Sequence, residues 1–153
     1  MKESKLIRKQ LDKTLQPYQA IGEAGIPRLG WISAIRKALG MSARQLGARL
    51  GLSQQRVAQI EKQELAGGLT IKAMRKVAEG LDCRFVYAFV PNGSLEEIVA
   101  RQARRVALRR LAQASHTMKL EDQALGRDSD NEILAEMVAE MTADPPGELW
   151  DTK

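Results

Sequence analysis

A step of four residues, Leu50-Gly51-Leu52-Ser53, joins two short helical patterns and constrains the fold more than any other feature of the chain. Ser42, with Gln45 three residues later, predicts a capping box that begins the first helix. Ser53 predicts the N-cap of the second helix. Gly51 suits a left-handed turn between them, because a residue without Cβ adopts that conformation at little cost. The sequence therefore predicts two helices that cross at close range.

The residues around this step meet the demands of such a crossing. Gly47 is small and lies midway along the first helix, where the second helix must approach. Val57 and Ile60 provide two apolar anchors on the inner face of the second helix, whose first turn, Gln54-Gln55-Arg56, is polar. The set predicts a helix-turn-helix that inserts its second helix into a DNA groove, although an ordinary helical hairpin has similar spacings. We favour DNA binding because all these demands are met together in a basic chain.

The charge of the chain is distributed unevenly. Residues 1–93 contain 16 lysines and arginines and 7 aspartates and glutamates, a net charge of +9. Residues 94–127 have a net charge of +3 and residues 128–153 one of −7, which leaves +5 overall. A basic body with an acidic end fits a polyanionic partner, and it fits a well-solvated surface equally well.

Composition argues against several other classes of protein. The single cysteine, Cys83, and the single histidine, His116, exclude an internal disulfide, a cysteine-based zinc site and a histidine pair. We expect no metal, no other cofactor and no catalysis, because the chain has neither a Gly-rich nucleophile turn near His116 nor a phosphate-cradling loop after a strand. No apolar run reaches the roughly 18 residues of a membrane helix. No apolar stretch follows the basic start, so we expect a cytoplasmic protein.

Apolar periodicity predicts a mostly α-helical chain with a long C-terminal helix and one β-strand. Helices are expected over residues 5–15, ended by Pro17, and over 31–39, 42–50, from 53 onward, 70–81, 94–114 and around 133–141. The segment Cys83–Val90 alternates aromatic residues and predicts the strand. The expected organisation is an N-terminal amphipathic helix and linker at 1–28, a helix-turn-helix domain at 29–82, a strand with a long helix at 83–127, and an acidic tail at 128–153.

A lone strand leaves its backbone N–H and C=O groups without partners, so the Cys83–Val90 strand needs another strand beside it. Pairing with the same segment of a second copy would form a homodimer. It would set two recognition helices about 34 Å apart, or a multiple of that, for a palindromic site on double-stranded DNA. The alternative partner is an unrecognised strand near residues 20–30. We favour the homodimer.

The segment Arg36–Leu81 resembles the phage-repressor type of helix-turn-helix, also called the Xre or Cro/C1 family, and Ser42–Glu61 is the stretch that matches. The domain of that family is a lambda-repressor-like bundle. The resemblance implies that the second helix enters the major groove with Gln54, Gln55 and Gln59 at base-reading positions, and a glutamine amide can bind adenine through two hydrogen bonds. It implies a structural pair formed by Arg36 and Glu61. The candidates for phosphate contacts are Ser42, Arg44, Arg56 and Lys62.

A wider resemblance covers roughly residues 5–125. The stretches Arg8–Asp12, Gly30–Ile32, Leu81–Pro91 and His116–Gln123 are similar, in this order, to the mobile mystery protein A family. The resemblance implies a gene on a mobile element beside that of a Fic-domain protein, mobile mystery protein B. This chain would be the DNA-binding, antitoxin-like member of the pair and a repressor of its own operon.

One short motif bears on that partner. Thr117 and Glu121 fit the first two elements of a Ser/Thr-x-x-x-Glu-Gly/Asn helix typical of Fic inhibitors, whereas Asp122 departs from the third. A solvated helix turn fits the same residues. The alternative function for the whole chain is a protein-interaction module, in which the long helix and the acidic tail bind and neutralise a toxin and DNA binding is secondary.

Overall fold

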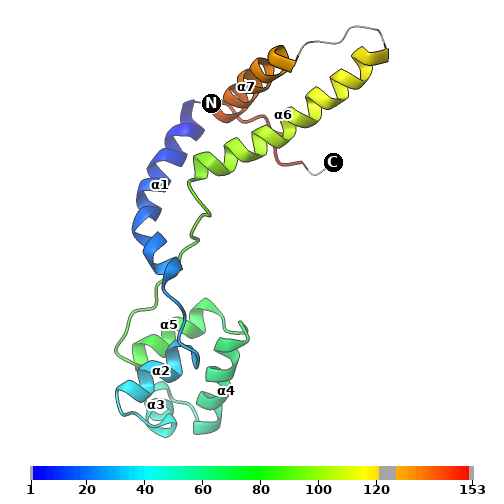
Figure 1. Cartoon of the computed structure of the whole chain (residues 1–153). Coiled ribbons are helices and arrows are strands. Elements are labelled where there is room, and N and C mark those ends of the chain that lie inside the picture. The colour runs from blue at the N-terminus through cyan, green and yellow to red at the C-terminus, as the bar shows by residue number, and fades with distance from the viewer. Residues whose placement is uncertain (1, 121–126, 152–153) are drawn as a thin grey trace. The chain divides into compact units, whose positions relative to one another are not determined.

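The computed structural model describes residues 2–120 and 127–151, which form seven α-helices. The helices are α1 (Lys2–Glu23), α2 (Gly30–Ala38), α3 (Ala43–Leu50), α4 (Gln54–Leu65), α5 (Ile71–Gly80), α6 (Leu95–Leu120) and α7 (Arg127–Ala143). The chain divides into two compact units (Figure 1): a central unit, Ala20–Ala88, and a split unit made of Met1–Gln19 and Phe89–Lys153. None of the described helices is both long and apolar enough to span a membrane.

The boundaries of the central helices follow from local chemistry that the sequence predicts. Ser42 Oγ accepts the backbone N–H of Gln45 at 3.2 Å, and the Gln45 side chain accepts the backbone N–H of Ser42 at 2.7 Å, so the predicted capping box is confirmed. Gly51 ends α3 in the left-handed conformation at a φ of +67°. Ser53 begins α4 by accepting the Arg56 N–H at 3.1 Å.

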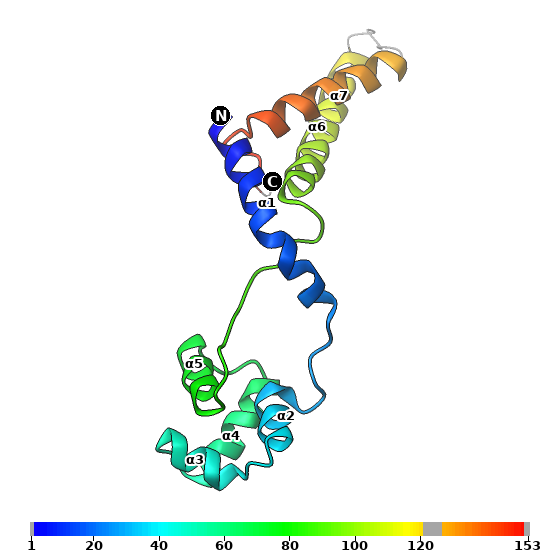
Figure 2. The ribbon, with the colours of Figure 1, turned by 90° about the vertical axis from the view of Figure 1, so that its left-hand side faces the viewer.

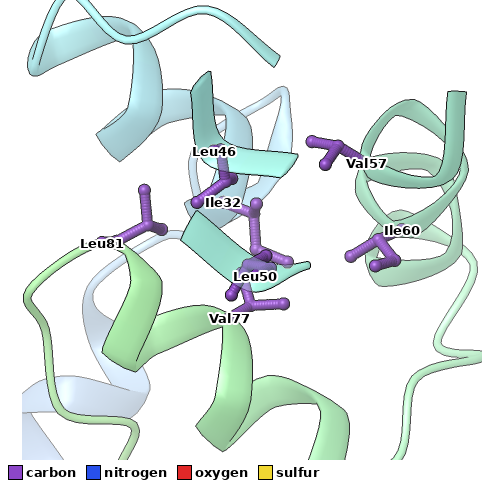
Figure 3. Packing of buried hydrophobic residues seen from close by; sticks show 7 residues of the cluster. All are labelled: Ile32, Leu46, Leu50, Val57, Ile60, Val77 and Leu81. Atoms are coloured by element: carbon purple, nitrogen blue, oxygen red, sulfur yellow. The ribbon is translucent and has the colours of Figure 1, made fainter. Parts of the chain in front are cut away.

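Seven buried apolar side chains from α2 to α5 form the core of the central unit (Figure 3). They are Ile32, Leu46, Leu50, Val57, Ile60, Val77 and Leu81. Burying one such side chain completely stabilises a fold by about 1.5–3 kcal/mol relative to leaving it exposed. Helix α4 contributes Val57 and Ile60 from a single face. The core therefore packs against the face of α4 that carries Val57 and Ile60 and leaves the opposite face exposed to solvent.

The split unit packs α6 against α7, which lie side by side in both views (Figures 1 and 2). Val99, Ala103 and Val106 of α6 meet Met141 of α7 and Leu149 beyond it. Leu149 is completely buried, and its carbonyl accepts a hydrogen bond from Gln102 Nε2 at 2.8 Å. Much of the acidic stretch 128–153 is thus a packed helix followed by a turn that reaches the core of this unit.

Helix α1 is longer than the sequence predicts. We expected Pro17 to end it, but Pro17 lies inside the helix. Proline removes one backbone donor, and the carbonyl that loses this donor can bond to water instead where the helix surface is exposed, as it is at Pro17. The remaining turns continue to Glu23.

Helix α1 packs on the split unit through polar side chains. Arg8 Nε donates to Glu96 Oε2 at 2.8 Å, and Asp12 Oδ1 accepts the backbone N–H of Leu95 at 2.8 Å. By contrast, Ile7 and Leu11 are 57% and 44% exposed. The helix is therefore fixed by directed bonds to the start of α6 and not by burial of its most apolar side chains.

The strand expected at Cys83–Val90 is not formed by the single chain, and this part of the predicted fold is corrected. Neither residues 2–120 nor residues 127–151 contain a strand, and the alternative partner near residues 20–30 is the end of α1 and an irregular linker. A strand requires a neighbouring strand that bonds to its backbone groups, and the described chain provides only helices, turns and irregular segments. Side chains hold part of the segment: the rings of Phe85 and Tyr87 stack at 6.2 Å, and the Arg75 guanidinium lies 6.0 Å from the Tyr87 ring centre.

Candidate nucleic-acid interface

Helix α4 separates an apolar face from a polar one. Val57 and Ile60 are 1% and 5% exposed, whereas Gln54, Gln55 and Gln59 are all exposed. With 3.6 residues per turn, the three glutamines project away from the two anchors. The structure therefore brings the predicted base-reading residues together on one accessible surface.

The three glutamines differ in how far their amides are already bonded. Gln59 Oε1 accepts a hydrogen bond from Arg56 Nη1 at 2.7 Å. Within the described residues, the side chains of Gln54 and Gln55 have no hydrogen-bond partner. The amide N–H groups and the amide oxygen of both Gln54 and Gln55 are therefore free to bond to a base edge. Gln59 has only its N–H groups free, because its oxygen already accepts the bond from Arg56.

The turn before α4 depends on a very close backbone approach. Leu52 N donates to the Gly47 carbonyl at 2.8 Å. A Cβ atom built on Gly47 would lie 2.5 Å from the Leu52 carbonyl oxygen, well inside van der Waals contact. The role predicted for Gly47 thus has a direct steric cause.

An ion pair ties α4 to α2. Arg36 Nε and Nη2 donate to the two carboxylate oxygens of Glu61 at 2.6 and 3.2 Å, and Arg36 Nη1 donates to the Met41 carbonyl at 2.9 Å. The side chains are 11% and 17% exposed. A two-bond arginine–carboxylate pair fixes orientation as well as distance, so it sets how α4 lies on α2.

Sequence reasoning missed a second carboxylate that connects the same helices. Glu64 accepts the backbone N–H groups of Trp31 and Ile32 at 2.8 and 3.0 Å and so caps the start of α2. Gly30 has a φ of +79°, and a Cβ there would lie 2.6 Å from Glu64 Oε2. One signal was present: Leu29, the N-cap residue of α2, has no side-chain oxygen, so the helix needed a cap from elsewhere.

The predicted phosphate contacts and Thr117 lie at the surface of the described chain. The phosphate candidates Ser42, Arg44, Arg56 and Lys62 are all exposed. Thr117 lies on α6 and donates to the Gln113 carbonyl at 3.1 Å, while Glu121 lies outside the described residues. In residues 2–120 and 127–151 no group of three histidine, cysteine, aspartate or glutamate side chains is placed to hold a metal ion.

Comparison with known protein families agrees with this geometry. The family model that matches is described as helix-turn-helix, and it covers residues 32–87. Residues 32–87 are a helix-turn-helix domain. This domain is of the Xre type, a DNA-binding type, and lies within the central unit. No curated protein and no solved structure matches the chain.

Replacing Gly47 by alanine tests the close approach within the helix-turn-helix. Because the new methyl group must displace the Leu52 backbone, we expect the central unit to lose about 1–3 kcal/mol of unfolding free energy. Trp31 fluorescence in a Trp150→Phe background reports urea unfolding of this unit alone. Gly25→Ala is the control, since nothing lies within 4 Å of a Cβ there. Equal unfolding midpoints for the two variants would contradict the steric role of Gly47.

Proposed function

We propose that the chain is a sequence-specific, non-catalytic transcriptional regulator that reads duplex DNA through the exposed face of α4. The observation that carries the proposal is the pair of uncommitted amides on Gln54 and Gln55, held at the start of a helix whose opposite face is buried through Val57 and Ile60. The helix-turn-helix match to residues 32–87 supports DNA as the ligand.

The chemistry of recognition follows from these side chains. A glutamine amide donates to adenine N7 or accepts from its N6 amino group, and a well-formed two-bond contact discriminates between bases by about 1–3 kcal/mol. Gln59 joins when its bond with Arg56 opens, which also frees the Arg56 guanidinium for a phosphate. Ser42, Arg44 and Lys62 would supply further phosphate contacts, which position the helix without reading sequence.

We also propose that the regulator is a homodimer joined through residues 83–90, for binding to a palindromic operator. Within the described chain, the backbone N–H and C=O groups of residues 84–90 make no hydrogen bond. Tyr87 and Phe89 are 56% and 88% exposed. A two-fold axis at Tyr87 would pair Phe85 of one copy with Phe89 of the other, and each copy would supply the backbone ladder that the other lacks.

The narrower role rests on the resemblance of residues 5–125. We propose a repressor of its own operon that is also the antitoxin-like partner of a Fic-type protein. Thr117 and Glu121 are the candidate inhibitory residues in that pairing.

A row of exposed glutamates on α7 favours the alternative function, in which the chain binds and neutralises a toxin. We propose this row as the acidic region that contacts the partner protein. Glu132, Glu136 and Glu140 are exposed on α7 at intervals of four residues. Their substitution leaves Met141 and Leu149 in the core of the split unit. Deleting residues 128–153 would remove that core, so point substitutions are the better probe.

The double substitution Gln54→Ala with Gln55→Ala tests base reading. We expect affinity for a duplex selected by the wild-type protein to fall about 5- to 150-fold for each lost two-bond contact, with little change for a scrambled duplex. Fluorescence anisotropy on both duplexes measures this. Gln10→Ala with Gln113→Ala is the matched control, because these exposed glutamines lie on the split unit. An unchanged preference for the selected duplex would refute base reading by α4.

A single cysteine at the proposed two-fold axis tests the dimer. In a Cys83→Ser background, we expect Tyr87→Cys to form a disulfide-linked dimer, because facing residues in antiparallel strands have Cα atoms about 4.5–5.5 Å apart. Ala88→Cys is the control, since residue 88 would face residue 86 of the other copy. Non-reducing electrophoresis and sedimentation report the result. Equal cross-linking at both positions, or a monomer at the concentrations that bind DNA, would reject this interface.

Co-expression with the Fic-domain product of the adjacent gene tests the partner. We expect the two proteins to co-purify, and Glu132→Gln with Glu136→Gln and Glu140→Gln to weaken the complex while operator binding stays intact. Absence of any complex with the wild-type chain would rule out the Fic partner. A complex unaffected by the triple substitution would place the contact elsewhere than on α7.

A further inference from the structure

A groove of about 450 Å³ lies on the split unit between α1 and the segment that leads into α6. Three lysines of α1, Lys5, Lys9 and Lys13, line one side of it. Pro91 and Ser94 line the other side. The base-reading face of α4 belongs to the central unit, so this groove is a separate feature of the molecule.

The three lysines form a regular row of positive charge. They recur every four residues, so each is about 6 Å further along the helix axis and on nearly the same face. All three are exposed, and within the described residues none of them makes an ion pair or a hydrogen bond. None of the three ammonium groups is therefore held in a direct ion pair within the described chain, although the Asp12 carboxylate lines the same groove.

The carboxylates that also line the groove already have partners. Asp12 accepts the backbone N–H of Leu95 at 2.8 Å, and Glu96 accepts from Arg8 Nε at 2.8 Å. The Arg8 side chain is only 11% exposed and donates a further bond to the Thr142 carbonyl at 2.7 Å. These bonds fix α1 beside α6, so the lysine row stands on a helix whose position is set.

We propose that this lysine groove binds the phosphodiester backbone of double-stranded DNA, as a contact that is independent of base reading. The inference rests on the proposed function, which makes a duplex the ligand of this chain. Three ammonium groups at regular spacing in an open groove fit a polyanion with repeated charges better than a single small anion. Gln16, Gln19 and Ser94 line the same groove and add neutral donors of the kind that contact phosphate oxygens.

A backbone contact of this kind has a distinct signature. It strengthens binding to every sequence equally, and each phosphate neutralised adds about 0.9 to the slope of log affinity against log salt concentration. Loss of base-reading residues changes the preference between duplexes instead. The two kinds of contact can therefore be separated in one set of titrations.

The test is the full-length variant Lys5→Gln with Lys9→Gln and Lys13→Gln, titrated between 50 and 200 mM salt against the selected and the scrambled duplex. We expect the salt slope to fall by about 2 to 3, since three contacts at roughly 0.9 each are lost. Both duplexes should lose affinity by the same factor. Lys5→Arg with Lys9→Arg and Lys13→Arg keeps the charges and should keep the slope, which controls for disturbance of the helix.

Arg104→Gln with Arg105→Gln is the second control. These exposed arginines of α6 also have no partner in the described chain and do not line the groove. We expect their loss to change the slope by less than about 1, although it removes two charges. If the salt slope falls by the same amount per charge removed in both variants, the effect comes from the general positive charge of the protein, and the proposed groove contact is wrong. An unchanged salt slope in the lysine variant would also show that the proposal is wrong. If the lysine variant lost binding to double-stranded RNA while its binding to duplex DNA stayed intact, the proposal of a DNA contact in the groove would be wrong as well.

Failure of this inference can be told apart from failure of the proposed function. If the wild-type chain binds neither duplex, the DNA-binding regulator itself is wrong. If the wild-type chain prefers the selected duplex and Gln54→Ala with Gln55→Ala abolishes that preference, the regulator stands. The lysine variant then decides the groove alone.

Discussion

The absence of a side chain at Gly47 determines how the helix-turn-helix is built. Because the Leu52 carbonyl occupies the space that a Cβ would need, α4 starts directly against the middle of α3. From that position Val57 and Ile60 enter the core, and the polar residues of α4 face outward. The carboxylates of Glu61 and Glu64 then hold the other end of α4 to α2. The surface that we propose reads DNA is thus fixed at both ends of α4 by contacts on the opposite face of the helix.

The features that could be predicted from the sequence are those that depend on near neighbours. A capping box at Ser42, a turn at Gly51 and anchors at Val57 and Ile60 each follow from residues within a few positions of one another, and the structure has all of them. The bond from Trp31 to Glu64 spans 33 residues, and although Leu29 signals that α2 lacks a local cap, no local pattern identifies Glu64 as the residue that supplies it. At Pro17 a local rule gives the wrong prediction. Proline usually ends a helix, but α1 continues through Pro17, where the helix surface is exposed to water.

The segment 83–90 shows where periodicity is insufficient. Its alternating aromatic residues have the pattern of a strand, but a strand is a property of two segments, and the described chain provides only one. Likewise, the charges of Arg8 and Asp12 gave no sign that they would attach α1 to the start of α6 across more than 80 residues. The base and phosphate contacts of the site remain predictions, since their partner is not part of the chain.

The split unit also has a consequence for synthesis on the ribosome. Helix α1 cannot form its bonds to the rest of this unit until α6 and α7 have been synthesised, because Arg8 bonds to residues 88 and 134 positions further along the chain. The central unit, in contrast, is continuous and is released from the exit tunnel as one piece. The helix that we propose reads DNA can therefore fold before the split unit is complete, because only the split unit needs residues from both ends of the chain.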